Sequence, residues 1–166
     1  AISLLGKVLF FGSMPITQVM FPKVAALYNK KKPTKHILYK SALMILMFSI
    51  PIITIYFLFS KFIVSFLYGN LYLEASNLLG WFGILMSLFS FVYLISFYNL
   101  SIHKKNFLYI VGLFNILEIA LIYTFHNTLA QVVSILTVLM FVLACIMLLK
   151  VILTKDGKSL NNNSSV

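Results

Sequence analysis

The sequence predicts an all-α membrane protein, a polytopic bundle of about five transmembrane helices. Apolar residues make up 61% of the chain and charged residues 10%, which leaves too little polar surface for a water-soluble domain of this length. The apolar residues gather in long runs, and most of the lysines lie in the gaps between those runs. Both features are typical of a protein that crosses a bilayer several times.

Each expected span has roughly the 20 apolar residues that a bilayer core requires. In chain order the spans are Ile2–Phe21, Ile37–Phe59, Ser76–Ile102, Phe107–Phe125 and Gln131–Leu153. The apolar segment Lys61–Gly69 is too short to cross. We interpret it as an interfacial segment or as an extension of the second helix, ended by Gly69 and Asn70.

The ends of the chain carry two further expectations. Because the chain begins with Ala1 and is apolar from the start, we expect it to be the C-terminal part of a longer protein. Residues 1–154 are predicted to form a transmembrane bundle, and the polar residues 155–166 a disordered cytoplasmic tail.

The gaps between the spans alternate in charge. The first gap holds a cluster of lysines around Lys31, and the third holds Lys104 and Lys105, whereas the second and fourth are poor in lysine. The positive-inside rule therefore places the first gap, the third gap and the C-terminus in the cytoplasm. The expected location is the cytoplasmic membrane, crossed several times.

The net charge of +10 does not indicate a nucleic-acid-binding protein. All thirteen basic residues are lysines, and they flank apolar runs, where they can contact lipid headgroups. We therefore expect membrane lipids as partners and no nucleic acid.

Glu118 lies near the centre of the fourth span, where an acidic side chain costs about 2–3 kcal/mol to insert. Asn115 precedes it by about one turn on the same face. A carboxyl at this depth can take up a proton, so we interpret the pair as a proton- or cation-coupling site, or as a cavity wall that faces a substrate. The alternative is a protonated Glu118 hydrogen-bonded to a neighbouring helix.

The first span holds two further cavity candidates, Lys7 and Gln18. Lys7 lies about 22 Å along the helix from Pro22, in the outer part of the membrane. It can face a central cavity and attract a pyrophosphate, or it can snorkel to the outer headgroups. Pro15 frees the carbonyl of Phe11, and such breaks are tolerated where another helix or a wet cavity meets the freed group.

Other residues favour packing over chemistry. A stripe of small residues on the third span predicts close helix contacts: Gly80, Gly83, Ser87 and Ser90. Pro51 predicts a kink in the second span, either static or used as a bend for alternating access. The histidines His36, His103 and His126 are dispersed, and Cys145 is the sole cysteine, so we expect no metal site and no cofactor.

Several stretches resemble the polysaccharide and lipid-linked oligosaccharide flippases, part of the multidrug/oligosaccharidyl-lipid/polysaccharide exporter superfamily. The resembling residues are the helix end Phe21-Pro22-Lys23, the turn Lys104-Lys105, and Phe66-Leu67-Tyr68-Gly69 with Tyr72, Ala75, Leu78 and Leu79. The resemblance implies two bundles of six helices with cytoplasmic termini. The five spans and their orientation then match helices eight to twelve, with the N-terminal half of the same transporter as partner.

Three function classes compete. The resemblance implies a transporter that flips or exports a lipid-linked oligosaccharide or polysaccharide precursor. An enzyme is disfavoured, because the outer gaps offer only Glu74 and His126, and the inner gaps hold no acid before Asp156. We therefore assign no catalytic residue. The alternatives are a cation-coupled multidrug antiporter, expected to hold more intramembrane carboxylates than Glu118, and a non-catalytic structural subunit.

Overall fold

The computed structural model describes residues 2–69, 73, 76–124 and 128–153, and within these ranges the chain is all-helical. The helices are α1 (Ile2–Asn29), α2 (Lys35–Leu58), α3 (Ser60–Tyr68), α4 (Leu79–Ser101), α5 (Phe107–Thr124) and α6 (Leu129–Leu153). All except α3 are long and apolar enough to cross a membrane. The predicted fold class, an all-α bundle with five spans, is confirmed. Ala1, Tyr72, Glu74, Ala75, Phe125, His126 and the predicted tail 155–166 lie outside the described residues.

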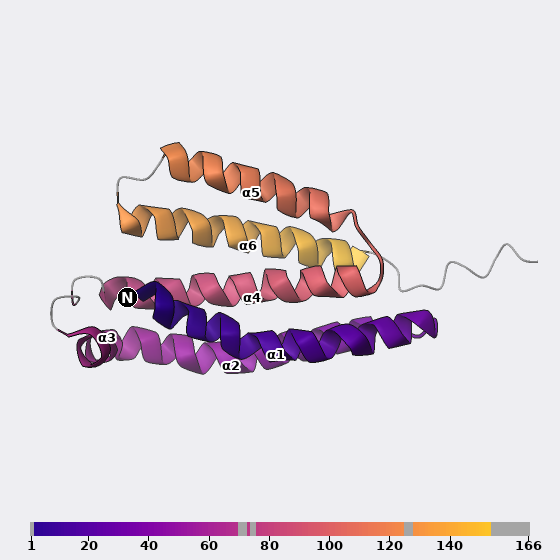
Figure 1. Ribbon diagram of the computed structural model, residues 1–166, viewed down its shortest axis with the longest axis horizontal. Helices are drawn as coiled ribbons and strands as arrows, with labels where there is room; N and C mark the ends of the chain where they lie inside the picture. Colours follow the sequence, from indigo (N-terminus) through magenta and orange to yellow (C-terminus); the bar gives the residue numbers. More distant parts are fainter. Residues whose placement is uncertain (1, 70–72, 74–75, 125–127, 154–166) are drawn as a thin grey trace, which may run out of the picture.

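The five long helices run side by side in alternating directions (Figure 1). Helix α4 is central, since it packs against α1, α2 and α6. Helix α5 packs mainly on α6 and lies at the outer edge of the bundle, opposite α1 and α2 (Figure 1). The α1–α2 turn, the α4–α5 turn and the end of α6 all lie at one end of the bundle, which we call the lysine-rich end. It holds Lys30, Lys31, Lys32, Lys35, Lys104, Lys105 and Lys150.

Helix α1 is longer than the sequence indicates. The expected span ends at Phe21, but the helix continues through Pro22 to Asn29. A proline inside a helix removes one backbone hydrogen bond, here to the carbonyl of Gln18. The helix continues because Val24, beyond the proline, is fully buried in the core. The expectation that Phe21-Pro22-Lys23 closes the helix is therefore wrong, since tertiary packing outweighs the local effect of the proline.

The segment after α2 forms a separate short helix rather than an extension of α2. Phe59 interrupts the helical backbone between them. Helix α3 turns away from the axis of α2 and is seen nearly end-on in Figure 1. It buries Val64 while Phe62 and Phe66 stay exposed and stack on each other. Gly69 follows with a φ of 81°, a left-handed conformation that glycine adopts without strain. The crosswise direction and exposed aromatic rings fit the interfacial interpretation.

The small residues of α4 lie where the sequence places them, at the helix contacts. Gly80, Gly83, Ser87 and Ser90 are all buried. A Cβ at Gly83 would lie 3.1 Å from the Tyr56 ring and within 3.5 Å of side-chain atoms of Ile53 and Leu9. The absent side chain thus lets α4 approach both α1 and α2, as expected for helices packed in lipid.

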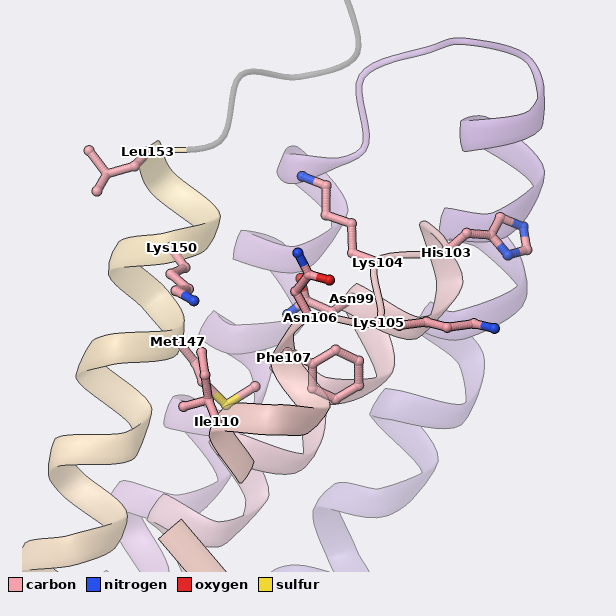
Figure 2. A pocket seen from close by; sticks show the side chains of 10 residues that line it. All are labelled: Asn99, His103, Lys104, Lys105, Asn106, Phe107, Ile110, Met147, Lys150 and Leu153. Carbon is pink, nitrogen blue, oxygen red and sulfur yellow. The ribbon is translucent and has the colours of Figure 1, made fainter. Parts of the chain in front are cut away.

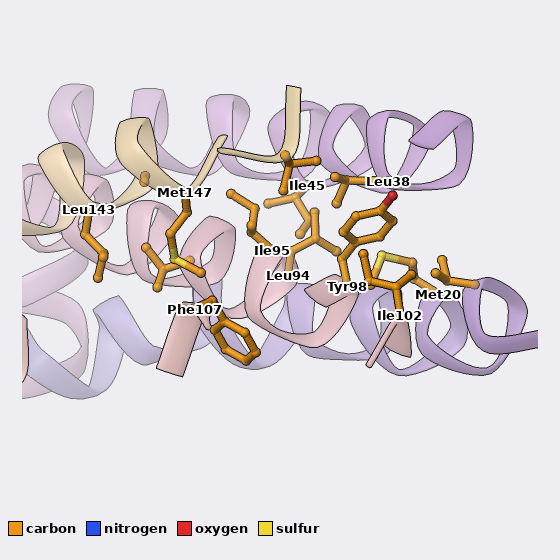
Figure 3. Close-up of a cluster of buried hydrophobic side chains, with 14 residues drawn as sticks. Met20, Leu38, Ile45, Leu94, Ile95, Tyr98, Ile102, Phe107, Leu143 and Met147 are labelled. Carbon is orange, nitrogen blue, oxygen red and sulfur yellow. The ribbon is translucent and has the colours of Figure 1, made fainter. Parts of the chain in front are cut away.

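The main core lies between α4 and its neighbours, towards the lysine-rich end (Figure 3). Its buried side chains come from all five spans: Met20 and Val24 from α1, Leu38 and Ile45 from α2, Leu94, Ile95 and Tyr98 from α4, Phe107 from α5, and Leu143 and Met147 from α6. A second cluster at the opposite end joins Leu9, Tyr56, Val64 and Leu79. Helix α5 contributes only Phe107 to the buried set, so it is the least embedded span.

Candidate functional site

Lys7 and Gln18 share the outward face of α1. They are separated by about three helical turns, and both side chains are exposed together with Pro15. The opposite face of α1 buries Leu9, Ser13 and Thr17 against the rest of the bundle. Pro22 has no N–H to donate to the Gln18 carbonyl. Gln18 therefore offers two polar groups on this uncovered face, its side-chain amide and its backbone carbonyl.

Glu118 and Asn115 lie on α5, at the other edge of the bundle. Glu118 is half-buried and Asn115 is exposed. Because α5 packs mainly on α6 whereas α1 packs on α4 and α2, the chain does not bring this pair together with Lys7 and Gln18. The four candidates therefore lie on two separate parts of the bundle, two on α1 and two on α5.

Four buried hydroxyl side chains lie within α1, α2 and α4, and the sequence does not predict them as a group: Ser13, Thr17, Ser49 and Ser90. Ser13 lies 2.7 Å from Ser90 across the α1–α4 contact, and its hydroxyl also lies 2.8 Å from the Phe10 carbonyl. The Thr17 and Ser49 hydroxyls are buried without a hydrogen-bond partner in the described part of the chain. Ser13 and Thr17 are four residues apart, so they lie on the same face of the helix. This spacing is the sequence pattern from which a buried polar face of α1 could be predicted.

The lysine-rich end is joined by two polar contacts. The hydroxyls of Thr34 and Tyr98 lie 2.9 Å apart, linking the start of α2 to α4. The Lys35 Nζ donates to the Ile152 carbonyl over 3.1 Å, so a cation from α2 neutralises part of the negative end of α6. The two contacts hold α2, α4 and α6 together at this end.

A cavity of about 590 Å³ opens at the lysine-rich end between the α4–α5 turn and the last turns of α6. Its lining residues are Asn99, His103, Lys104, Lys105, Asn106, Phe107, Ile110, Met147, Lys150 and Leu153. In Figure 2, Lys150 from α6 and Lys104 from the turn lie on the side of the cavity near α6, while Lys105 and His103 extend away from α6. The His103 ring instead lies 6.1 Å from the Tyr28 ring of α1.

The sequence does not predict this cavity, although it contains both of the charged segments that line it. Lys104 and Lys105 indicate the orientation of the protein in the membrane, and Lys150 lies near the end of the last span. Their proximity depends on how α6 packs against α4, which no local pattern reveals. Within the described residues, no three His, Cys, Asp or Glu side chains gather as metal ligands would.

Residues 4–77 match the family described as polysaccharide biosynthesis protein. No curated protein and no solved structure matches the chain. The matched part covers α1, α2 and α3, and it includes both Lys7 and Gln18. Over these residues the chain is similar to a family of polysaccharide biosynthesis proteins, which is consistent with the resemblance to polysaccharide flippases; the correspondence with helices eight to twelve stays a prediction.

Proposed function

We propose that this chain is part of a membrane transporter that flips or exports a lipid-linked oligosaccharide or polysaccharide precursor across the cytoplasmic membrane. The family match supports a polysaccharide-related membrane protein, and the five apolar helices support a multi-pass arrangement. The finer assignment, to transport rather than synthesis, has its support in the polar residues within the spans.

The exposed face of α1 is the observation that carries the proposal. Lys7 and Gln18 lie on it, within a span that is apolar enough to cross a membrane. Ionisable residues within spans face a bundle interior or a water-filled cavity, because exposure to hydrocarbon is costly. We infer that the N-terminal half of the same transporter covers this face and leaves a wet cavity between the two bundles.

Such a cavity suits a substrate with a sugar-pyrophosphate head and a lipid tail. Water lowers the cost of moving the charged head through the membrane, and the Lys7 amine offsets phosphate charge as a point cation. Glu118 lies on the other edge of the bundle, apart from this cavity, and would act there as a separate proton- or cation-coupling site. We assign no residue a catalytic role and infer no cofactor.

One observation favours the antiporter alternative, namely the carboxylate of Glu118 at mid-membrane depth. Among the described residues it is the sole acid, however, and antiport coupled to cations is expected to use more. The flippase is therefore the better proposal.

The test is delivery of lipid-linked sugar to the outer leaflet by the full-length protein in cells that lack it. We expect Lys7→Ala to reduce delivery about tenfold, because one phosphate contact is lost, and Lys7→Arg to retain most of it. Lys61→Ala is the matched control, since Lys61 is an exposed lysine in α3, at the same end of the bundle as Lys7. Equal delivery by all variants at equal expression would refute the role of Lys7, and drug export without sugar delivery would favour the antiporter.

A further inference from the structure

The cavity at the lysine-rich end has two kinds of wall. Lys104 and Lys150 supply positive charge on the side near α6, and Asn99 and Asn106 supply amides. Phe107, Ile110, Met147 and Leu153 supply apolar surface. No carboxylate of the described residues lines it.

The backbone adds to this charge pattern. Helix α5 begins at Phe107, which lines the cavity, so the positive end of its dipole lies there. The Lys35 amine on the Ile152 carbonyl offsets part of the opposing negative end of α6. The lysines and the start of α5 therefore favour an anion at the cavity.

The position of the cavity selects the kind of anion. It lies where α4 ends, α5 begins and α6 ends, which is the level of the lipid headgroups if these helices span the membrane. Lysines at this level bind phosphate as point charges, and the apolar wall below them can hold the first part of a hydrocarbon chain. A phosphate joined to a lipid chain can contact both the lysines and the apolar side chains of the cavity, whereas a soluble anion can contact only the lysines.

We propose that this cavity is a binding site for the phosphate or pyrophosphate head of a membrane lipid, with Lys104 and Lys150 as its cationic ligands. The site is separate from the α1 face that carries the proposed function, and its existence does not require transport. Two sources share this chemistry, an anionic phospholipid of the bilayer and a polyprenyl pyrophosphate carrier.

The experiment measures lipid retained by the purified full-length protein. The protein is exchanged into bilayers of phosphatidylcholine alone, phosphatidylcholine with phosphatidylglycerol, or phosphatidylcholine with polyprenyl pyrophosphate. It is then extracted in mild detergent, and the bound lipid is quantified by mass spectrometry. We expect the double variant Lys104→Ala/Lys150→Ala to retain about tenfold less phosphate lipid than the unaltered protein, with unchanged phosphatidylcholine.

Lys30→Ala is the matched control, because Lys30 is an exposed lysine at the same end of the bundle and carries the same charge but does not line the cavity. It should retain lipid within about twofold of the unaltered protein, a factor within the usual scatter of surface substitutions. Helical circular dichroism and gel filtration check folding. If the alanine variant fails either check, Lys104→Gln/Lys150→Gln replaces it, because glutamine removes the charge but keeps a polar side chain that is only one bond shorter.

Each outcome decides the proposal. Preferential loss of phosphatidylglycerol assigns the site to the bilayer's own lipid, and preferential loss of polyprenyl pyrophosphate assigns it to the carrier; both support a phosphate site. Equal retention by the double variant and the unaltered protein would overturn it. So would an equal loss in Lys30→Ala, which would indicate attraction to general surface charge. The experiment measures lipid binding and not transport. A negative result would therefore not refute the proposed transport function, and a negative transport result would not refute this binding site.

Discussion

Ser13 of α1 and Ser90 of α4 are joined by a hydrogen bond of 2.7 Å within the apolar spans. The Ser90 hydroxyl also lies 2.9 Å from the Met86 carbonyl and donates to it, so Ser13 donates to Ser90 and a short chain of bonds results. Both residues are nearly fully buried, and in lipid such a bond supports helix association.

Replacing Ser13 by Ala should therefore lower the free energy of unfolding in detergent by about 0.6 kcal/mol, the average for interhelical hydrogen bonds in membranes. Ser134→Ala is the control, since Ser134 is exposed and bonds within its own helix, to the Ala130 carbonyl. Reversible unfolding followed by circular dichroism measures both. A double-mutant cycle with Ser90→Ala should show coupling, and additive effects would contradict the pairing.

Two glycines offer a sharper contrast. Gly83 faces Tyr56 with a Cβ distance of 3.1 Å, whereas a Cβ at Gly112 would meet nothing within 4 Å. Gly83→Val should lower the free energy of unfolding by about 1–3 kcal/mol through overpacking, and Gly112→Val should change it little. Both substitutions carry the same change of helix propensity. Equal thermal shifts in detergent would mean that α4 does not pack as described.

The orientation of the bundle can be tested by reporter fusions. Fusions at Lys31, at Lys105 and at the C-terminus should report the cytoplasm, and those at Asn70 and Asn127 the outside, because lysine-rich gaps stay inside. An outside signal at Lys31 would reverse the whole arrangement.

Glu118→Gln in the full-length protein should insert and fold but transport poorly. Glutamine keeps the size and hydrogen bonding of the side chain and removes the titratable proton. Glu118→Asp, which keeps the carboxyl, should recover part of the transport, which we expect to fall at least tenfold in Glu118→Gln. Normal transport by Glu118→Gln at equal expression would support the alternative of a structural hydrogen bond.

The sequence predicts the spans well because each depends on composition within about 20 residues. It predicts the packing of Gly83 and Ser90 for the same reason, since small residues in a span have few other uses. It misplaces the end of α1, because the burial of Val24 beyond Pro22 is a tertiary effect.

Some of the candidate site residues can likewise be predicted from the local sequence, whereas others depend on tertiary packing. The sequence singles out Glu118 and Lys7 because an ionisable residue in an apolar run is visible locally. That Lys7 and Gln18 share one face of α1 follows from helical spacing, whereas the structure is needed to show that this face is uncovered. The cavity between Lys104 and Lys150 does not, because it forms only when the end of α6 lies against the α4–α5 turn.

The central place of α4 constrains how the protein is made. Helices α1 and α2 are synthesised before α4, yet much of their packing surface is provided by that later helix. Until Leu79–Ser101 has entered the bilayer, the Ser13 hydroxyl lacks the Ser90 hydroxyl as its partner. A nascent chain that stalls before α4 therefore leaves α1 and α2 without the helix against which both of them pack.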